Sequence, residues 1–201
     1  RQGGGMARSR RRAAARLAIR RLPRRAPSGY GAPMELLVAT GNAHKLEELK
    51  PLFPGHRLLK PADVGHAGFD VLEDGTTFLE NAMKKALALH ALTGRHSLAD
   101  DSGLAVRALG GAPGIYSARY GSEDGSRKLE AAERNAYLLS NIEGKTDRAC
   151  AFVCCLVLVL SDERFFAVQE SLEGELLAAP RGAGGFGYDP VVFLPALGRS
   201  V

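Results

Sequence analysis

The chain has 201 residues, 45% of them hydrophobic and 24% charged, which is ordinary for a globular protein and enough for one large domain or two small lobes. Residues 1–33 hold ten of the 27 lysines and arginines and no acidic residue, so the rest of the chain has 17 basic against 22 acidic residues and a net charge of −5. An acidic body argues against a nucleic-acid-binding domain and favours an enzyme whose carboxylates hold a metal ion.

Cysteine usage and the length of the apolar segments exclude further classes of protein. Cys150, Cys154 and Cys155 lie close together with no CxxC pair and no histidine nearby, so we expect small buried thiols in a reducing compartment rather than a zinc site or a disulfide framework. The longest apolar stretch, residues 149–160, has the length of a strand and is too short to span a membrane. We therefore expect a soluble, cytoplasmic protein with no membrane partner.

The arginine-rich arm, residues 1–33, is expected to be a disordered extension. It resembles a transit peptide, and it could also form a basic helix that binds nucleic acid or a membrane surface. We favour a third interpretation, translated sequence upstream of the true start, because Met34 directly precedes the first strand-like run. Nucleic-acid binding is expected, if at all, only through this arm.

The ordered chain is expected to open with a strand at residues 35–39, a Thr-Gly-Asn turn and a helix at residues 43–53. Lys45 stands in the first turn of this helix. Free backbone N–H groups, a glycine and a lysine together are typical of an anion-binding site. A plain capped helix start explains the same residues equally well, and no P-loop motif is present.

After a short strand near residues 57–60, the pattern predicts a helix over residues 78–93. Thr77 and Glu80 have the spacing of a capping box, and Gly94 is a natural stop. Glu73, just upstream, is either a loop charge or a metal ligand. The predicted apolar stripe of the helix comprises Phe78, Ala82, Met83, Ala86, Leu87 and His90.

Two adjacent aspartates, Asp100 and Asp101, precede Ser102 and Gly103 between two apolar runs. Neighbouring like charges repel each other, and a divalent cation is the usual counter-charge where other oxygen ligands are available. Taken alone, however, these four residues slightly favour a solvated turn in which aspartate caps the next element.

The second half of the chain predicts a helix, a hairpin and a glycine-rich loop. The helix is expected over residues 126–141, with Leu129, Ala132, Ala136 and Leu139 on one face. Residues 150–160 are apolar on both faces and predict a central strand, with residues 164–173 as its antiparallel partner. In the loop over residues 182–190, glycine permits close approach to a flat ligand, and Phe186 or Tyr188 could stack on a base; an ordinary turn is the alternative.

Four segments occur in order between Met34 and Pro195: ATGNAHKLEEL, EDGTTFLENAMKKA, ADDSGLAVRALGGAPGIYSARYG and GGFGYDPVVFLP. Together they resemble the inosine triphosphate pyrophosphatase family. The resemblance implies an α/β fold with a long curved mixed β-sheet flanked by helices, and two lobes around a central nucleotide cleft. It also implies a homodimer, a requirement for Mg²⁺, and hydrolysis of ITP, dITP or XTP to the monophosphate and pyrophosphate.

The resemblance further implies roles for individual residues. Asp101 would accept the proton of the attacking water and, together with Glu73, would face the metal ion. Ser102 would touch the substrate. The triphosphate would be held by Thr40, Gly41, Asn42, Ala43, His44 and Lys45. The wall of the base pocket would be formed by Phe186, Gly187, Tyr188 and Asp189.

The chain departs from the family pattern at two places. Ala151 precedes Phe152 where the family often has arginine, and the family's C-terminal lysine and Ser-His-Arg motif, which contact the nucleotide, are absent. We interpret residues 34–201 as a pyrophosphatase domain truncated at its C-terminus. The alternatives are a nucleotide-binding protein of the same fold with impaired catalysis, and a nucleic-acid-associated protein that acts through the arm.

Overall fold

The computed structural model describes residues 32–123, 125, 127–182 and 185–201. The chain divides into two units, Arg1–Ala32 and Pro33–Val201, and almost all of the first lies outside the described residues. The expectation that the arm is disordered therefore also lies outside them. The fold is that of the second unit alone.

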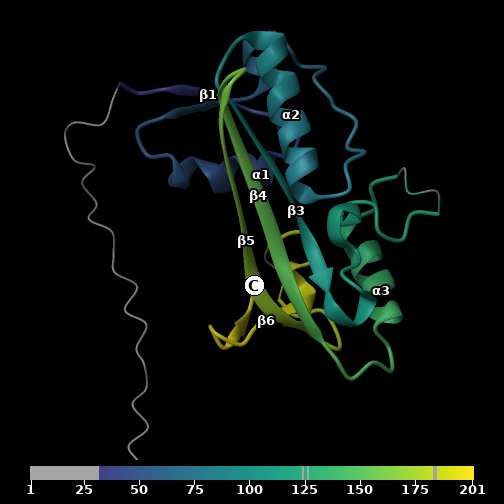
Figure 1. The fold of residues 1–201 in the computed structure, drawn as a ribbon. Coiled ribbons are helices and arrows are strands. Elements are labelled where there is room, and N and C mark those ends of the chain that lie inside the picture. Colours follow the sequence, from purple (N-terminus) through teal and green to yellow (C-terminus); the bar gives the residue numbers. More distant parts are fainter. Residues whose placement is uncertain (1–31, 124, 126, 183–184) are drawn as a thin grey trace, which may run out of the picture. The chain divides into compact units, whose positions relative to one another are not determined.

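Seven strands form one mixed, open sheet in the order β2-β1-β3-β4-β5-β6-β7 (Figure 1). β1 pairs in parallel with both β2 and β3, and the remaining pairs are antiparallel. β4 is the central strand, as its two apolar faces predict. The strands are β1 (Glu35–Val38), β2 (Arg57–Leu59), β3 (Ser97–Val106), β4 (Ala149–Ser161), β5 (Arg164–Leu176), β6 (Val192–Leu194) and β7 (Arg199–Ser200).

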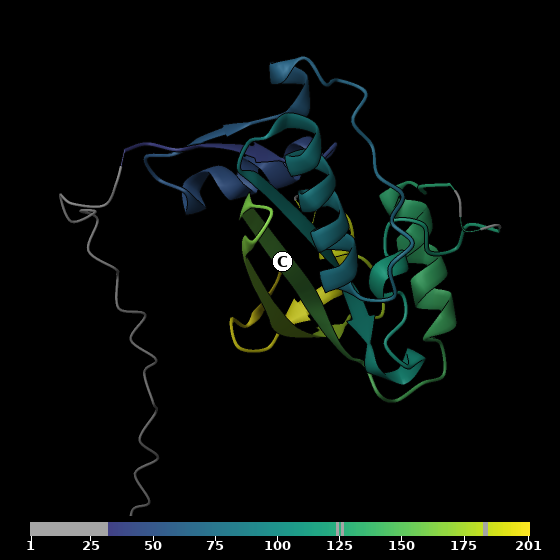
Figure 2. The same ribbon diagram turned by 45° about the horizontal axis from the view of Figure 1, so that its top comes forward.

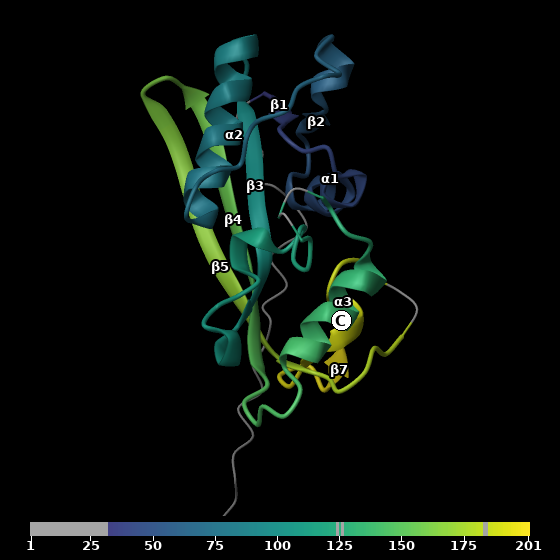
Figure 3. The ribbon, with the colours of Figure 1, turned by 90° about the vertical axis from the view of Figure 1, so that its right-hand side faces the viewer.

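Within the described residues, three α-helices cover the sheet: α1 (Ala43–Leu49), α2 (Phe78–Thr93) and α3 (Ala131–Asn141). Side chains alternate between the faces of a strand, so each helix packs on alternate residues. α2 covers the face that carries Ala99 and Val157, whereas α1 and α3 cover the face that carries Leu98 and Leu104. Figures 2 and 3 show α2 alone on its side of β3, with α1 near one end of the opposite side and α3 near the other.

The start and end of α2 confirm the sequence prediction. The Thr77 hydroxyl accepts a hydrogen bond from the Glu80 backbone N–H, while the Glu80 carboxylate accepts one from that of Thr77. Gly94 ends the helix in the left-handed conformation, with φ of 65°. The predicted stripe is wrong at Leu87, which is 40% exposed. Asn81 and Leu89, which the predicted stripe does not include, are buried on this helix.

Two other predicted helix boundaries and one predicted turn are wrong. α1 ends at Leu49 rather than residue 53, because Pro51 cannot continue the helix and a 3₁₀ turn follows. α3 begins at Ala131 rather than residue 126, and its buried residues are Asn135 and Leu138. The predicted face is wrong at Ala132 and Ala136, which are exposed, whereas Leu129 is buried ahead of the helix and Leu139 packs on the core. The four residues read as a solvated turn lie inside β3, paired with β4 throughout. Cross-strand pairing with an apolar partner has overridden the local turn preference.

The second half of β3 requires a glycine at position 103. A Cβ there would overlap the Gly114 carbonyl oxygen and the Ser117 hydroxyl, which belong to the 3₁₀ turn packed on the strand. We expect Gly103→Ala to lower the free energy of unfolding by about 2–3 kcal/mol, as overpacking of a closed core does, measured by urea denaturation. Gly68→Ala is the control, because a Cβ there meets nothing within 4 Å. Equal effects of the two substitutions would contradict this account.

No helix in the described part of the chain is both long and apolar enough to cross a membrane.

Candidate functional site

The site is built along an open stretch of one edge of β3. β1 pairs with β3 only at Ser97 and Leu98, after which β1 ends and the chain turns into α1. Farther along, the Ser117 hydroxyl accepts a hydrogen bond from the Leu104 N–H at 2.9 Å. Between these points, within the described residues, no strand pairs with this edge of β3. The segment Ala99–Gly103 therefore offers backbone groups and side chains to a ligand.

The two aspartates of this segment point to opposite faces of the sheet. Asp100 pairs across the sheet with Leu156 and Asp101 with Cys155, and neighbouring strand residues alternate in direction. Asp100 therefore meets α1, whereas Asp101 meets α2. Adjacent carboxylates that repel each other in the sequence are thus separated, and each has its own positively charged partner.

Asp100 lies beside Lys45, in the first turn of α1. Its Oδ2 is 2.5 Å from Lys45 Nζ and accepts a hydrogen bond from the Ser102 hydroxyl at 3.3 Å. The carboxylate is buried, and its Oδ1 has no hydrogen-bond partner among the described residues. A buried oxygen without a partner is costly. Asp100 thus holds Lys45 at the open edge and keeps one oxygen free for a further donor or cation.

Asp101 is buried on the other face, against α2. Its Oδ2 accepts a hydrogen bond from Asn81 Nδ2 at 3.3 Å, and its Oδ1 is 3.5 Å from Lys85 Nζ. Burial raises the pKa of Asp101; the positive charge of Lys85 opposes this rise, and the negative charge of Glu73 adds to it. A carboxylate with a raised pKa is a stronger base than an exposed one.

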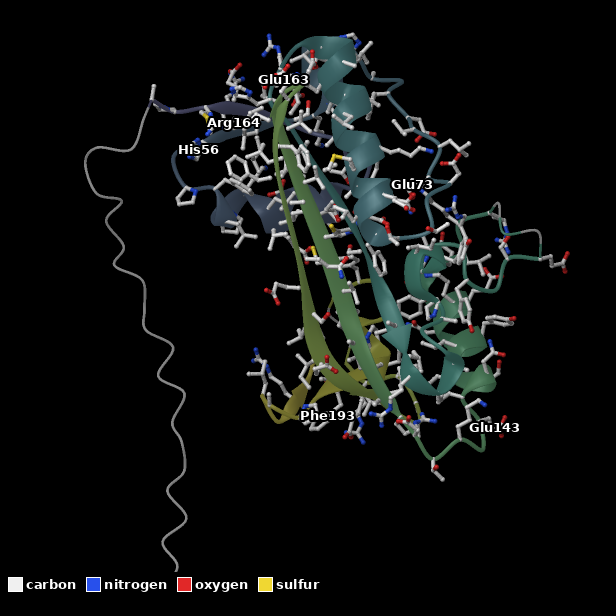
Figure 4. The ribbon with its side chains drawn as sticks, in the orientation of Figure 1. His56, Glu73, Glu143, Glu163, Arg164 and Phe193 are labelled. Carbon is white, nitrogen blue, oxygen red and sulfur yellow. The ribbon has the colours of Figure 1, made fainter. Side chains whose placement is uncertain are left out.

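Glu73 reaches the same lysine from the loop before α2, beside which it lies in Figure 4. Lys85 Nζ donates a hydrogen bond to Glu73 Oε1 at 2.8 Å. Burial tends to raise the pKa of Glu73, but the hydrogen bond and charge of Lys85 lower it overall, helped by the charges of Lys128 and Arg119. Burial likewise opposes the charge on Lys85, yet its two acidic neighbours raise its pKa. The ion pair of Glu73 with Lys85 therefore favours the charged form of both groups.

A close packing of the loop on α2 places Glu73 there. Asn81 Oδ1 accepts a hydrogen bond from the Gly75 N–H at 2.9 Å while its amide nitrogen binds Asp101. A Cβ at Gly75 would lie 2.6 Å from that same Oδ1, so only glycine permits the approach. Asn81 is 1% exposed and connects the loop to β3.

The Thr-Gly-Asn turn forms the start of α1. The Thr40 hydroxyl accepts a hydrogen bond from the Asn42 N–H at 3.1 Å, and Asn42 Oδ1 caps the helix by accepting one from the His44 N–H at 2.9 Å. Gly41 is exposed, its φ is not positive, and Ala43 is the first helical residue. α1 has seven residues, so its dipole is small. Lys45 is the main positive charge of this segment.

The glycine-aromatic loop reaches across to the same turn. The ring of Phe186 stacks on the imidazole of His44, with ring centroids 5.5 Å apart and an angle of 10° between the planes. Asp189 Oδ2 accepts a hydrogen bond from the Phe186 N–H at 2.7 Å, and the Gly187 carbonyl oxygen accepts one from Asn135 Nδ2 at 3.1 Å. α3 thus anchors the loop, and Asp189 stiffens it from within.

The Tyr188 side chain packs in the core rather than at the surface. It is 5% exposed, and its hydroxyl donates a hydrogen bond to the Ser117 carbonyl oxygen at 2.9 Å. Burial raises its pKa to about 12, against the lowering effect of the Arg134 guanidinium that lies over the ring. Two aromatic rings are candidates for stacking on a base. The ring of Phe186 is half-buried and contacts His44 of α1, whereas the ring of Tyr188 is buried.

The structure therefore gathers the residues singled out from the sequence into two groups that meet at the open edge of β3. On the α1 and α3 side lie Thr40, Gly41, Asn42, Ala43, His44, Lys45, Ser102, Phe186 and Gly187, with Tyr188 and Asp189 turned inward as supports. On the α2 side lie Asp101 and Glu73.

Sequence reasoning missed Lys85, Asn81 and Asn135. Asn81 and Lys85 are four residues apart and so share one face of α2. An asparagine on the buried stripe of a helix needs a polar partner, and that was the available signal. No pattern indicates the bond between Asn135 and the loop, because the two lie 52 residues apart.

The donor set suits Mg²⁺ held jointly with phosphate. Among the described residues, no group of three or more histidine, cysteine, aspartate or glutamate side chains is arranged to hold a metal ion. Mg²⁺, however, commonly takes one or two carboxylates and completes its shell with phosphate oxygens and water. Asp101 and Glu73 supply such a pair of carboxylates.

Comparisons of the sequence with known proteins identify its relatives. A sequence model of the Ham1 family matches residues 36–201. The dITP/XTP pyrophosphatase of Treponema denticola is 47% identical over 167 residues, covering 83% of this chain and 85% of that protein. A dITP/XTP pyrophosphatase of Thermus thermophilus is 48% identical over 172 residues, with 83% and 79% covered.

Solved structures show the same fold. A HAM1 protein from Coxiella burnetii superposes with a TM-score of 0.74 at 34% identity, covering 83% of this chain and 85% of that one. The Ham1 protein of Staphylococcus aureus has a TM-score of 0.73 at 36% identity, with 83% and 84% covered. Because the family model matches most of the chain and these relatives share its α/β fold, the chain belongs to the Ham1 family, the inosine triphosphate pyrophosphatases that its four sequence segments resemble.

Proposed function

We propose that the protein hydrolyses nonstandard purine nucleoside triphosphates (ITP, dITP and XTP) to the monophosphate and pyrophosphate. The observation that carries the proposal is an acid–lysine cluster that meets Lys45 and Phe186 at one open strand edge. The cluster consists of Asp101 and Lys85, which are largely buried, and Glu73, which is about a third exposed. The names of the curated relatives, dITP/XTP pyrophosphatases, support the same substrates.

The cluster suits attack by water on a phosphoanhydride. Asp101 is a buried carboxylate with a raised pKa, and it accepts a proton from the attacking water as the new P–O bond forms. The P–O bond that joins the α- and β-phosphates breaks, and the departing phosphate group keeps the electron pair of that bond, so that the monophosphate and pyrophosphate are released. Lys45 and Lys85 offset the negative charge of the phosphates on the two faces of β3.

Mg²⁺ belongs to this proposal as the ion that arrives with the triphosphate. Asp101 and Glu73, on the α2 side of β3, would hold it. When bound, Mg²⁺ neutralises phosphate charge. The role of Lys85 is then to keep the two carboxylates ionised and in place.

The base is proposed to bind on the ring of Phe186. That ring is half-buried and is held from behind by Asp189 and, through Gly187, by α3. A flat purine stacks on an aromatic face without distinguishing its substituents. Phe186 therefore contributes affinity for purines in general.

Pyrophosphate release is the direct test. We expect release from ITP and XTP well above that from ATP and GTP, and its loss when Mg²⁺ is chelated. No release from any nucleotide would contradict the proposed enzyme and leave a nucleotide-binding protein of this fold. Equal rates with all four nucleotides would keep the reaction and overturn the substrate class.

A homodimer is also proposed, supported by the surface of β5. Residues 164–173 of this strand are exposed on both faces. Among the described residues, β6 pairs with β5 only at Glu175 and Leu176, the last two residues of β5. Phe166, Val168 and Leu172 share one face and are 47–55% exposed. Exposed apolar residues gathered on one strand mark an interaction surface. We therefore expect this face to meet a second copy.

We expect the wild-type protein to elute with the mass of a dimer in size-exclusion chromatography with light scattering. Phe166→Glu should shift it to the mass of a monomer, because a charge cannot be buried unpaired in an apolar contact. Phe165→Glu, on the opposite face of β5, is the matched control. A monomeric wild type, or a shift with the control alone, would contradict the proposed interface.

The cytoplasm is the proposed compartment, supported by the cysteines. All three are free thiols: Cys150 and Cys155 are buried, whereas Cys154 is exposed rather than buried. Free thiols are usual in a reducing compartment.

A further inference from the structure

The stacked pair His44–Phe186 joins the two ends of the candidate nucleotide site. His44 is the second residue of α1, and Phe186 lies in the loop before β6. The rings are nearly parallel, at 10°, with centroids 5.5 Å apart. Aromatic rings in direct contact have centroids about 4.5–7 Å apart. The imidazole and the phenyl ring therefore touch, and no base fits between them.

The two partners differ in how firmly they are held. The Phe186 N–H donates a hydrogen bond to Asp189 Oδ2, and the neighbouring Gly187 carbonyl oxygen accepts one from Asn135 Nδ2. These two hydrogen bonds hold the backbone that carries the phenyl ring. His44 is held through its backbone N–H by Asn42, while its side chain is exposed. Rotation about two side-chain bonds is enough to take the imidazole off the phenyl ring. His44 is thus the movable partner.

We propose that His44 covers the base-stacking face of Phe186 in the empty enzyme and swings away when a purine nucleotide binds. This inference rests on the proposed function, because it takes the base to stack on Phe186. His44 is then a positioning residue that reduces the fraction of molecules ready to bind. The apparent affinity falls in proportion to that fraction. The reduction applies to every ligand that carries a base and to none that lacks one.

The experiment compares two ligands that differ in the base. The first is the α,β-methylene analogue of ITP, which cannot release pyrophosphate, and the second is inorganic tripolyphosphate. We expect His44→Ala to bind the analogue about 2- to 10-fold more tightly than the wild type, the factor that corresponds to the loss of one aromatic pair. Tripolyphosphate should bind both proteins equally, because the phosphate contacts of the turn are assigned to Lys45 and to the backbone of residues 40–45, not to the His44 imidazole. Calorimetry measures both affinities.

Two further variants separate the proposed role from a structural one. His44→Phe keeps a ring on Phe186 and should bind the analogue no more tightly than the wild type. In a Phe186→Ala background, His44→Ala should no longer change the affinity for the analogue, since there is no face left to cover. This double-mutant cycle isolates the coupling between the two rings.

Each contrary result is specific. Weaker or unchanged binding of the analogue by His44→Ala would overturn the proposal, as would an equal change for tripolyphosphate, which would indicate a phosphate contact. Persistence of the effect without Phe186, or no binding of the analogue by either protein, would also overturn it. Pyrophosphate release from ITP by the wild type tests the proposed function separately, so either proposal can fail while the other stands.

Discussion

Replacement of Asp101 by asparagine is expected to lower the rate of pyrophosphate release from ITP by roughly 10²-fold or more, the loss typical of a missing general base. An amide cannot accept the proton of water, yet it has nearly the same shape as the carboxylate. Asn81 can still donate its hydrogen bond to the new side-chain oxygen, so the fold should be retained. Turnover at saturating substrate, with circular dichroism as the check on folding, measures both parts.

Asp162→Asn is the matched control for this variant. Asp162 lies in the turn between β4 and β5 with its side chain 93% exposed, so the same chemical change there should leave turnover at the wild-type level. A near-normal rate for Asp101→Asn would move the role of proton acceptor to Asp100 or Glu73. Loss of the folded spectrum would show instead that the carboxylate is needed for stability.

The second large effect is expected from Lys85→Met. The lysine side chain is 12% exposed and lies between Glu73 and Asp101, so its removal leaves two neighbouring carboxylates without a counter-charge. Removal of one partner from a buried ion pair costs about 3–5 kcal/mol. Because Glu73 is about a third exposed and so partly solvated, we expect a loss of about 2–3 kcal/mol in the free energy of unfolding, measured by urea denaturation at pH 7.

Lys84→Met gives the comparison at the adjacent position. Lys84 pairs with Asp74, but both side chains are about half exposed, so its removal should cost less than about 1 kcal/mol. In an Asp101→Asn background, Lys85→Met should cost less than in the wild type, because one of the two repelling charges has gone. Equal losses for the two lysines, or no relief in the double variant, would contradict the assigned electrostatics.

Local patterns in the sequence determined most of the secondary structure. The ends of α2 follow from a capping box and a glycine, which act within a few residues, and the central position of β4 follows from apolar residues on both of its faces. The order of four segments was also enough to indicate the family, because each carries residue types with a specific chemistry. These features depend on neighbours in the chain and on composition, which a sequence contains directly.

Only the tertiary structure decided how the site is divided. The sequence shows two adjacent aspartates that resemble a turn; pairing with β4 makes them part of a strand, and strand alternation then sends them to opposite faces. Asp100 consequently meets Lys45, whereas Asp101 meets Lys85 and Asn81. The contacts of His44 with Phe186 and of Asn135 with Gly187 are equally nonlocal. Such contacts depend on which segments the sheet brings together, and no local preference of either residue encodes them.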